Sequence, residues 1–368
     1  MNMSMYGFGL TMGAVYLLIL AVAAFQPSLA PRNILFGISV PKSAVDDDGV
    51  RRLRRSYTGQ VIGYGLAFGI LVAAGILWRT GGSMPADDLT QWLATLPVGA
   101  LLALLGIAGG LFVAFHQKAE RLKREAGWQE ERRIAASLSI RKERLHYPLY
   151  AFAPHLLVIL ICAGAAWLLY DRIPDSIITH YNDRGIPDRI EAKSYGTVFQ
   201  MNFVQLFMLA VFIFVNYTTG AARVKIDPAD PERSEEQQRR YRKGMSLLLL
   251  LLGLGMMIFM GFLQVFMLYG GSRMNGVLIG AAGIAPLVMS AAVVVRMMKL
   301  GKNRMEASRP GEDAKWKAGA FYWDRSDSAI FVEKRTGIGF TLNWGHPVSW
   351  VILAGILGFA LIPLILNL

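Results

Sequence analysis

The chain has 368 residues, of which 54% are hydrophobic and 17% are charged, and its formal net charge at pH 7 is +12. This composition is too apolar for an ordinary soluble domain and indicates a membrane protein. The positive charge does not favour a nucleic-acid-binding protein, because no soluble domain of useful size carries it. The single cysteine, Cys162, excludes an intramolecular disulfide bond and a cysteine-based metal cluster.

Eight apolar segments are each about long enough to cross a lipid bilayer, because roughly 20 helical residues span its hydrocarbon core. We expect transmembrane helices at residues 6–25, 57–78, 92–115, 148–170, 197–219, 245–269, 276–298 and 347–366. The first segment has no Lys or Arg before it, whereas a cleavable signal peptide begins with basic residues. We therefore expect the first segment to be a retained helix.

The distribution of Lys and Arg between the apolar segments predicts the topology. Four connecting segments contain 32 of the 38 basic residues, at positions 26–56, 116–147, 220–244 and 296–346. Basic loops stay on the cytoplasmic side of a membrane. Eight helices with these four segments inside place both termini outside.

Few polar side chains fall inside the apolar segments, and none in mid-segment is charged. This argues against a proton-driven transporter or an ion pump, which need ionisable groups at membrane depth. Asn202 and Gln205 share a helix face in the outer half of residues 197–219. They can form hydrogen bonds between helices, or they can line a water-accessible pocket under the external loop. His155 is expected to be a packing or interfacial residue.

Known catalytic motifs are missing from the sequence. It contains no HExxH zinc motif, no GxSxG nucleophile motif, and no glycine loop of the Walker or dinucleotide-binding type. The five histidines do not have the spacing of metal ligands. We therefore expect no catalytic residues, no metal and no cofactor, and an enzyme is the less favoured class.

The external loop at residues 171–196 contains a motif. Residues 177–181 alternate like a short strand, and residues 182–185 are turn-forming. The motif consists of Pro174, Ile177, His180, Tyr181, Asn182, Gly185, Pro187, Asp188 and Lys193. It resembles the signature of an uncharacterised bacterial membrane family that includes an immunity protein against the sporulation-delaying toxin. The resemblance implies protection of the cell membrane and capture of a regulator there.

The motif and the nearby polar pair together form the predicted ligand site. Its residues are His180, Tyr181, Asn182, Gly185, Asp188, Lys193, Asn202 and Gln205. A peptide toxin or a lipid-linked molecule is the ligand class that the resemblance implies. The alternative is a compact connector whose polar residues only bond the loop to itself.

A second resemblance covers residues 316–346, which look like a short module in relatives of the same family. Residues 319–323 and 329–333 alternate as expected for a hairpin around an Asp/Ser turn. Backbone amides in the basic, glycine-containing turn that follows can bind an anion. The predicted inner-face contacts to an anion or regulator are Lys334, Arg335, Gly337, Gly339 and Asn343. The alternative is a cap packed against the helix ends.

The first basic segment also matches those relatives. Residues 46–48 are three aspartates that can cap a helix, and the basic residues at 51–55 follow them. We expect the basic face of this helix to lie on the membrane surface.

The sequence therefore predicts an all-α polytopic protein of the bacterial cytoplasmic membrane, with a small cytoplasmic β-hairpin module before the last helix. The predicted domains are a seven-helix membrane domain at 1–298, the module at 299–346 and a last transmembrane helix at 347–368. The favoured function is a non-enzymatic toxin-immunity or sensor protein. The alternatives are a transporter or exporter component and a membrane-embedded enzyme that acts on lipid or peptide. Expected partners are the lipid bilayer, the external ligand and a cytoplasmic regulator, but no nucleic acid.

Overall fold

The computed structural model describes residues 3–80, 86–128, 145–181, 187–222, 224, 226, 230–269, 276–301, 311–337 and 339–365. The long helices are α1 (Met3–Ala24), α3 (Asp48–Thr80), α4 (Ala86–Glu125), α6 (Ala153–Leu168), α7 (Tyr195–Ala221), α8 (Pro231–Tyr269), α9 (Gly276–Gly301) and α10 (Pro347–Ile365). The short helical elements are α2 (Gln26–Leu29), η1 (Lys42–Ala44), η2 (Leu149–Phe152), η3 (Tyr170–Arg172) and η4 (Asp313–Lys315). Each predicted apolar segment lies largely in a helix.

Several described helices have the length and composition of membrane spans. Five stretches are long and apolar enough to cross a membrane, namely Asp48–Trp78, Thr95–Glu125, Leu149–Leu168, Tyr195–Ala221 and Pro231–Tyr269. Shorter apolar helical stretches lie at Met12–Ala24, Val288–Met297 and Pro347–Gly358. The structure thus supports a membrane protein. The total of eight spans, the outward termini and the cytoplasmic membrane stay predictions.

Short antiparallel hairpins make up the described β-structure. β1 (Ile34–Leu35) pairs with β2 (Ile38–Ser39), and β3 (Ser176–Tyr181) pairs with β4 (Pro187–Ala192). β5 (Trp316–Lys317) pairs with β6 (Phe321–Tyr322), and β7 (Phe331–Glu333) pairs with β8 (Phe340–Leu342). β3 confirms the strand predicted in the loop, and the last two hairpins confirm that strands precede the last helix.

The strand pairing predicted before the last helix is wrong. The sequence pattern pairs residues 319–323 with 329–333, whereas in the structure β6 pairs with β5 and β7 pairs with β8. The chain reverses where glycines adopt positive φ, with values of 70° at Gly319, 80° at Gly337 and 94° at Gly339. Because glycine enters this region without steric cost, these positions select the turns.

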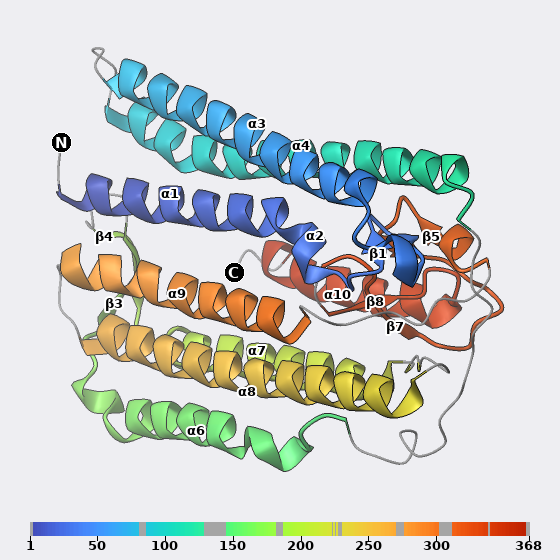
Figure 1. Cartoon of the computed structure of the whole chain (residues 1–368). Coiled ribbons are helices and arrows are strands. Elements are labelled where there is room, and N and C mark those ends of the chain that lie inside the picture. Colours follow the sequence, from blue (N-terminus) through green and yellow to red (C-terminus); the bar gives the residue numbers. More distant parts are fainter. Residues whose placement is uncertain are drawn as a thin grey trace.

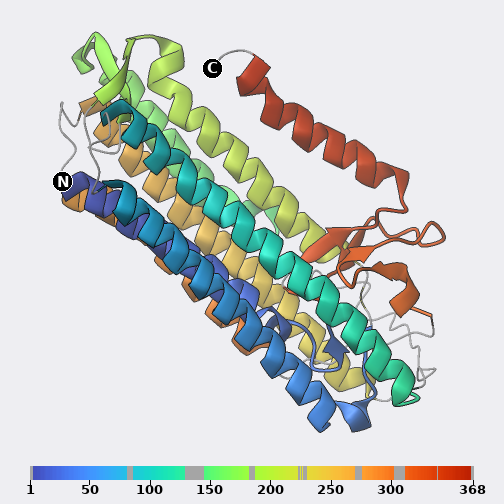
Figure 2. The ribbon, with the colours of Figure 1, turned by 90° about the horizontal axis from the view of Figure 1, so that it is seen from above.

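The long helices run side by side in an elongated bundle (Figure 1). α3 and α4 form one side, α1, α9 and α8 follow, and α6 and α7 pack on α8. The β3–β4 hairpin lies at one end of the bundle, and β5 to β8 lie towards the other end (Figure 2). α10 runs apart from the other helices in this view. The two hairpin regions are thus separated by the length of the helices.

The tip of the β1–β2 hairpin is part of the helix core. Phe36 is buried there, and its ring centroid lies 5.1 Å from that of Tyr57, 5.9 Å from Phe112 and 5.4 Å from Phe115. Phe36 and Gly37 both have positive φ, as a two-residue type I′ turn requires. Burial of a phenylalanine side chain contributes roughly 1.5–3 kcal/mol, so this contact fixes the hairpin between α3 and α4.

Candidate functional site

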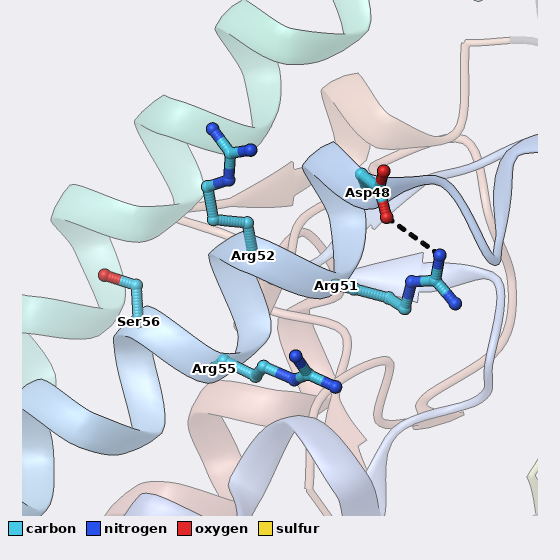
Figure 3. Close-up of a pocket in the computed structure, with 5 residues that line it drawn as sticks. All are labelled: Asp48, Arg51, Arg52, Arg55 and Ser56. Carbon is cyan, nitrogen blue, oxygen red and sulfur yellow. Dashed lines mark hydrogen bonds and ion pairs between the residues drawn. The ribbon is translucent and has the colours of Figure 1, made fainter.

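A basic pocket lies on the first turns of α3. Its volume is about 720 Å³, and it is lined by Asp48, Arg51, Arg52, Arg55 and Ser56 (Figure 3). Each of these residues lies three or four positions from another of them, so they occupy one helix face. Arg51 donates a hydrogen bond of 2.8 Å to Asp48. Arg52 and Arg55 are exposed and have no hydrogen-bond or ion-pair partner among the described residues.

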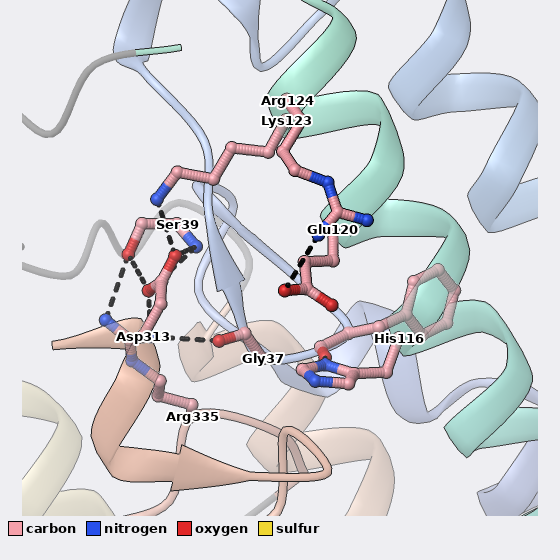
Figure 4. Close-up of polar contacts among 9 residues, drawn as sticks. Gly37, Ser39, His116, Glu120, Lys123, Arg124, Asp313 and Arg335 are labelled. Atoms are coloured by element: carbon pink, nitrogen blue, oxygen red, sulfur yellow. Dashed lines mark hydrogen bonds and ion pairs between the residues drawn. The ribbon is translucent and has the colours of Figure 1, made fainter. Parts of the chain in front are cut away.

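A second polar site joins the last hairpin to the first hairpin. Arg335, which follows β7, is completely buried (Figure 4). Its Nη1 donates to the Gly37 carbonyl over 2.9 Å and to Asp313 Oδ1 over 2.5 Å, and its Nη2 donates to Ser39 Oγ over 2.9 Å. A buried guanidinium is tolerated only when its charge and its donors are paired. Arg335 therefore depends on both hairpins being in place.

Asp313 is the charged partner at this site. Its carboxylate accepts hydrogen bonds from the Ser39 N–H (3.1 Å), the Ser39 hydroxyl (2.8 Å) and Lys123 Nζ (2.8 Å). Burial by itself raises the pKa of the Asp313 carboxyl. The charge of Arg335 and the hydrogen bonds from Lys123, Arg335 and Ser39 outweigh burial and lower this pKa to about 2. Asp313 is therefore ionised at neutral pH and links β2, α4 and the segment after β7.

We call residues 311–337 and 339–345 the C-terminal module, and its other side contacts α7 and α8. Arg242 of α8 is buried and donates hydrogen bonds to the carbonyls of Thr219 (3.0 Å) and Ala222 (2.7 Å). These carbonyls belong to the C-terminal end of α7, where a helix leaves acceptors unpaired. Arg242 Nη2 also lies 4.0 Å from the Glu333 carboxylate of β7. One side chain of α8 thus ties the C-terminal end of α7 to the module.

The β3–β4 hairpin carries most of the predicted ligand residues. His180 pairs with Arg189 and Tyr181 pairs with Pro187, but the side chains of His180, Tyr181 and Asp188 are outside the described part of the structure. Asn182 and Gly185 also lie outside the described residues. Ligand contact by these five residues stays a prediction.

Lys193 is held at the base of this hairpin. Its Nζ donates a hydrogen bond of 3.0 Å to the Ile173 carbonyl and lies 4.9 Å from the centroid of the Tyr170 ring. Tyr170 stacks on Tyr195 at 4.9 Å, and Tyr195 stacks on Trp167 at 5.9 Å. Because Trp167 and Tyr195 are exposed, the ends of α6 and α7 present an aromatic surface beside the hairpin.

Asn202 and Gln205 are brought together inside the bundle. Asn202 Nδ2 donates to Gln205 Oε1 over 3.0 Å, and Gln205 Nε2 donates to the Met257 carbonyl over 3.0 Å. Gln264 of α8 donates to Asn202 Oδ1 over 2.7 Å. All three polar side chains are buried, and their bonds connect α7 with α8. This geometry agrees with the interhelical alternative, and contact of Asn202 and Gln205 with a ligand stays a prediction.

Further buried polar contacts follow α7 and α8 towards the C-terminal module. His155 Nε2 lies 3.0 Å from the Leu250 carbonyl, which agrees with its predicted packing role. Nearer the module, Ser246 Oγ donates to Asn216 Oδ1 over 2.5 Å, and Asn216 Nδ2 donates to the Tyr147 carbonyl over 2.9 Å. These bonds hold the helices in one register between the two hairpin regions.

The predicted inner-face residues lie around the β7–β8 turn. Lys334 is exposed, and its N–H donates to the Gly339 carbonyl over 3.0 Å. Asn343 is completely buried and donates hydrogen bonds to the carbonyls of Asp324 (2.8 Å) and Asp327 (3.1 Å). Asn343 and Arg335 therefore bond within the protein, and Gly337 and Gly339 shape the turn. Contact of this group with an anion or regulator stays a prediction.

Several residues of this site carry no local sequence signal. Asp313 stands next to Glu312, and Ser39 lies in an apolar stretch, so neither position predicts a partner; Glu333 lies within a short strand. Lys123 and Arg242 belong to the basic segments that predict the topology, and only their nearness to apolar segments 92–115 and 245–269 sets them apart. Within the described residues, no group of three or more His, Cys, Asp or Glu could hold a metal ion.

Two family models match parts of the chain. Residues 157–206 match "Domain of unknown function (DUF1648)", and residues 325–350 match "Family of unknown function (DUF5808)". The first match covers most of α6, the β3–β4 hairpin and the start of α7. The second covers much of the C-terminal module and the start of α10. These matches agree with a membrane family of unknown function. No curated protein and no solved structure gave a significant match.

Proposed function

We propose that this chain is a non-enzymatic membrane protein of the sensor or toxin-immunity class. In this proposal the β3–β4 hairpin contacts a peptide or lipid-linked ligand outside, and the C-terminal module responds on the cytoplasmic side. One observation carries it: α7 starts at the hairpin and ends at Arg242, which also contacts the module. A single helix thus connects the two regions that the family models match.

The hairpin end of α7 is firmly joined to the hairpin. Ser194 caps the helix two residues after β4, and its Oγ accepts a 3.1 Å hydrogen bond from the Thr197 N–H. Ile177 of β3 is buried in one cluster with Val198 of α7 and Leu268 of α8. A ligand that moves the hairpin therefore acts directly on the ends of α7 and α8.

The other end of α7 is joined to the C-terminal module by two kinds of contact. Phe214 of α7 packs edge-on against Phe331 of β7, with ring centroids 5.8 Å apart. Arg242 bonds the last carbonyls of α7 and lies beside Glu333, whose carboxylate also accepts a 3.4 Å hydrogen bond from Gln238. Because Arg242 is buried and its contacts are specific, a shift of α7 requires β7 to move or to release it.

The surface beside the hairpin suits a ligand with both apolar and charged groups. Trp167 and Tyr195 expose stacked rings, and Ile190 of β4 is also exposed. Arg189 and Glu191 flank Ile190 and form an ion pair of 3.1 Å. Peptides and lipid-linked molecules combine these chemistries, which supports the proposed ligand class.

The test uses the full chain expressed in a sensitive bacterial host. Cells are challenged with a panel of cationic membrane-active peptides and of compounds that bind lipid-linked cell-wall precursors, and survival is measured. We expect protection against at least one member, and loss of protection in His180→Ala and Asp188→Asn at unchanged melting temperature. Thr179→Ala, on the neighbouring position of β3, is the matched control.

Coupling is measured on the purified protein with the protective compound from this panel. We expect the compound to change hydrogen exchange in residues 331–343, and Glu333→Gln to keep binding but reduce that change. Absence of protection by the whole panel would overturn the immunity proposal. Binding without any exchange difference at the module would overturn the sensor proposal.

Two other classes remain as alternatives, and each has its own assay. A transporter component would have to use the buried polar side chains of α7, such as Asn202 and Gln205, and an enzyme would have to use polar residues of the external loop, such as His180 and Asp188. Flux of the compound into proteoliposomes would identify a transporter, and its chemical turnover by the purified protein would identify an enzyme. Either result would replace the proposed function.

A further inference from the structure

The basic pocket on α3 is separate from the contacts that hold the first hairpin. Of the four arginines in this stretch, Arg54 points to the hairpin and donates to the carbonyls of Arg32 (2.6 Å) and Ile34 (3.2 Å). The other three line the pocket, and two of them, Arg52 and Arg55, have no partner among the described residues. Their exposure is therefore not explained by the fold.

The chemistry of the pocket favours a phosphate group. A guanidinium donates two parallel hydrogen bonds to a phosphate, and it is weakly hydrated compared with an ammonium group. Three guanidiniums and the Ser56 hydroxyl line an open space of about 720 Å³, which has room for a phosphate together with its substituents (Figure 3). The Asp48 carboxylate neutralises Arg51 in part, so the free positive charge is centred on Arg52 and Arg55.

The same helix face continues as an open apolar surface. Gly59 and Gly63 follow Ser56 at helical spacing, and a Cβ atom added to either glycine would meet nothing within 4 Å. Beyond them, Leu66 and Ile70 are exposed. Small residues let another molecule approach a helix closely, and the exposed leucine and isoleucine continue the apolar face over further turns. The basic pocket thus adjoins an exposed apolar face of the same helix.

We propose that this face of α3 binds an anionic phospholipid. Its phosphate lies in the pocket at Arg52 and Arg55, and an acyl chain lies along Gly59, Gly63 and Leu66. The continuous apolar face favours a lipid over free phosphate, which would use only the pocket. Basic residues at the end of a membrane helix attract anionic headgroups. The proposal assigns a lipid site to α3 and does not depend on the proposed function.

Lipid binding to the purified full-length protein in detergent tests this assignment. Phosphatidylglycerol is titrated, and bound lipid is counted by native mass spectrometry, with phosphatidylcholine of the same acyl chains as the zwitterionic comparison. We expect selective binding of phosphatidylglycerol. The double variant Arg52→Gln/Arg55→Gln should weaken this binding roughly thirtyfold, because each arginine contributes a factor of roughly five to the affinity.

A matched control removes two exposed arginines elsewhere. Arg124 of α4 and Arg240 of α8 lie on the solvent side and pair with Glu120 and Glu236 at i,i+4. Arg124→Gln/Arg240→Gln should therefore leave the affinity for phosphatidylglycerol within about threefold of the unmodified protein. An equal loss in both double variants would mean that only net charge matters, and it would overturn the site.

The apolar face is tested separately by covering one of its glycines. Gly63→Leu should weaken phosphatidylglycerol binding several-fold while the arginines stay in place, whereas Gly106→Leu on the exposed face of α4 should not. These glycine variants test the lipid site even if the double arginine variant does not fold. Three results would each overturn the assignment of a lipid. The protein could bind phosphatidylcholine with equal affinity, inorganic phosphate could displace the lipid at equal concentration, or Gly63→Leu could leave binding unchanged.

Discussion

Asp313→Asn is the substitution that best tests how the C-terminal module is attached. It keeps the size of the side chain and removes the negative charge that faces Arg335 and Lys123. The Asp313 side chain is only 12% exposed and the Arg335 side chain is not exposed at all, so water cannot replace the lost charge. We expect the module to detach from the first hairpin more often than in the unmodified protein.

The magnitude follows from two independent arguments. A fall in the pKa of Asp313 from the ordinary 3.8 to about 2 corresponds to roughly 2.5 kcal/mol of folding free energy. Removal of one partner from a buried ion pair typically costs about 3–5 kcal/mol. Since asparagine keeps an acceptor oxygen for Ser39 or Lys123, we expect a cost of about 2–4 kcal/mol.

Hydrogen exchange of the backbone amides in residues 331–343 measures this cost locally. A loss of about 2–4 kcal/mol corresponds to exchange that is roughly 30- to 800-fold faster at these amides. Asp46→Asn is the matched control, because Asp46 also pairs with an arginine, Arg32, at 2.9 Å. Its side chain is 74% exposed, so its loss should cost less than about 1 kcal/mol.

The effect also has a defined pH dependence. Because the pKa of Asp313 is lowered in the folded protein, its stabilisation is complete above the unfolded pKa of 3.8 and is lost as the pH falls towards 2. The difference between the unmodified protein and Asp313→Asn should therefore be constant near neutral pH and shrink between about pH 4 and pH 2. The prediction is wrong if Asp313→Asn speeds hydrogen exchange no more than Asp46→Asn does. It is also wrong if the difference between Asp313→Asn and the unmodified protein does not change between about pH 4 and pH 2.

Three further predictions address the turns and the topology. Gly37→Ala should destabilise the protein by about 2–5 kcal/mol in a thermal melt, because φ at Gly37 is +88° and the new Cβ would overlap the backbone of Gly319. Gly63→Ala is the control and should have no such effect, because the space around Gly63 is open. Gly339→Val should lower the free energy of unfolding by about 1–3 kcal/mol, because φ at Gly339 is +94°. It should also expose residues 320–340 to limited proteolysis, and resistance equal to that of the unmodified protein would contradict this prediction. A cysteine at Ser176 should react with an impermeant thiol reagent in intact cells, and one at Ser328 only after lysis; the reverse pattern would invert the predicted topology.

Features that depend on local pattern could be predicted from the sequence. The apolar segments predicted where helices form, since burial in a membrane requires a continuous apolar stretch and not a long-range partner. The alternation in residues 177–181 predicted β3, and the position of His155 predicted a packing residue. For Asn202 and Gln205 the sequence left a ligand site and an interhelical contact open. The glycines of the β7–β8 turn were recognised because positive φ is a local requirement.

The tertiary structure alone decided which distant residues meet. Arg335 bonds Ser39 and Gly37 across 296 and 298 residues, and no period or motif links these positions. The pairing of β5 with β6 could not be predicted from the sequence either, because short alternating strands fit more than one register until their turns and neighbours are placed. A buried charge takes whichever partner the packed helices bring within hydrogen-bond distance, and that distance exists only after the chain has folded.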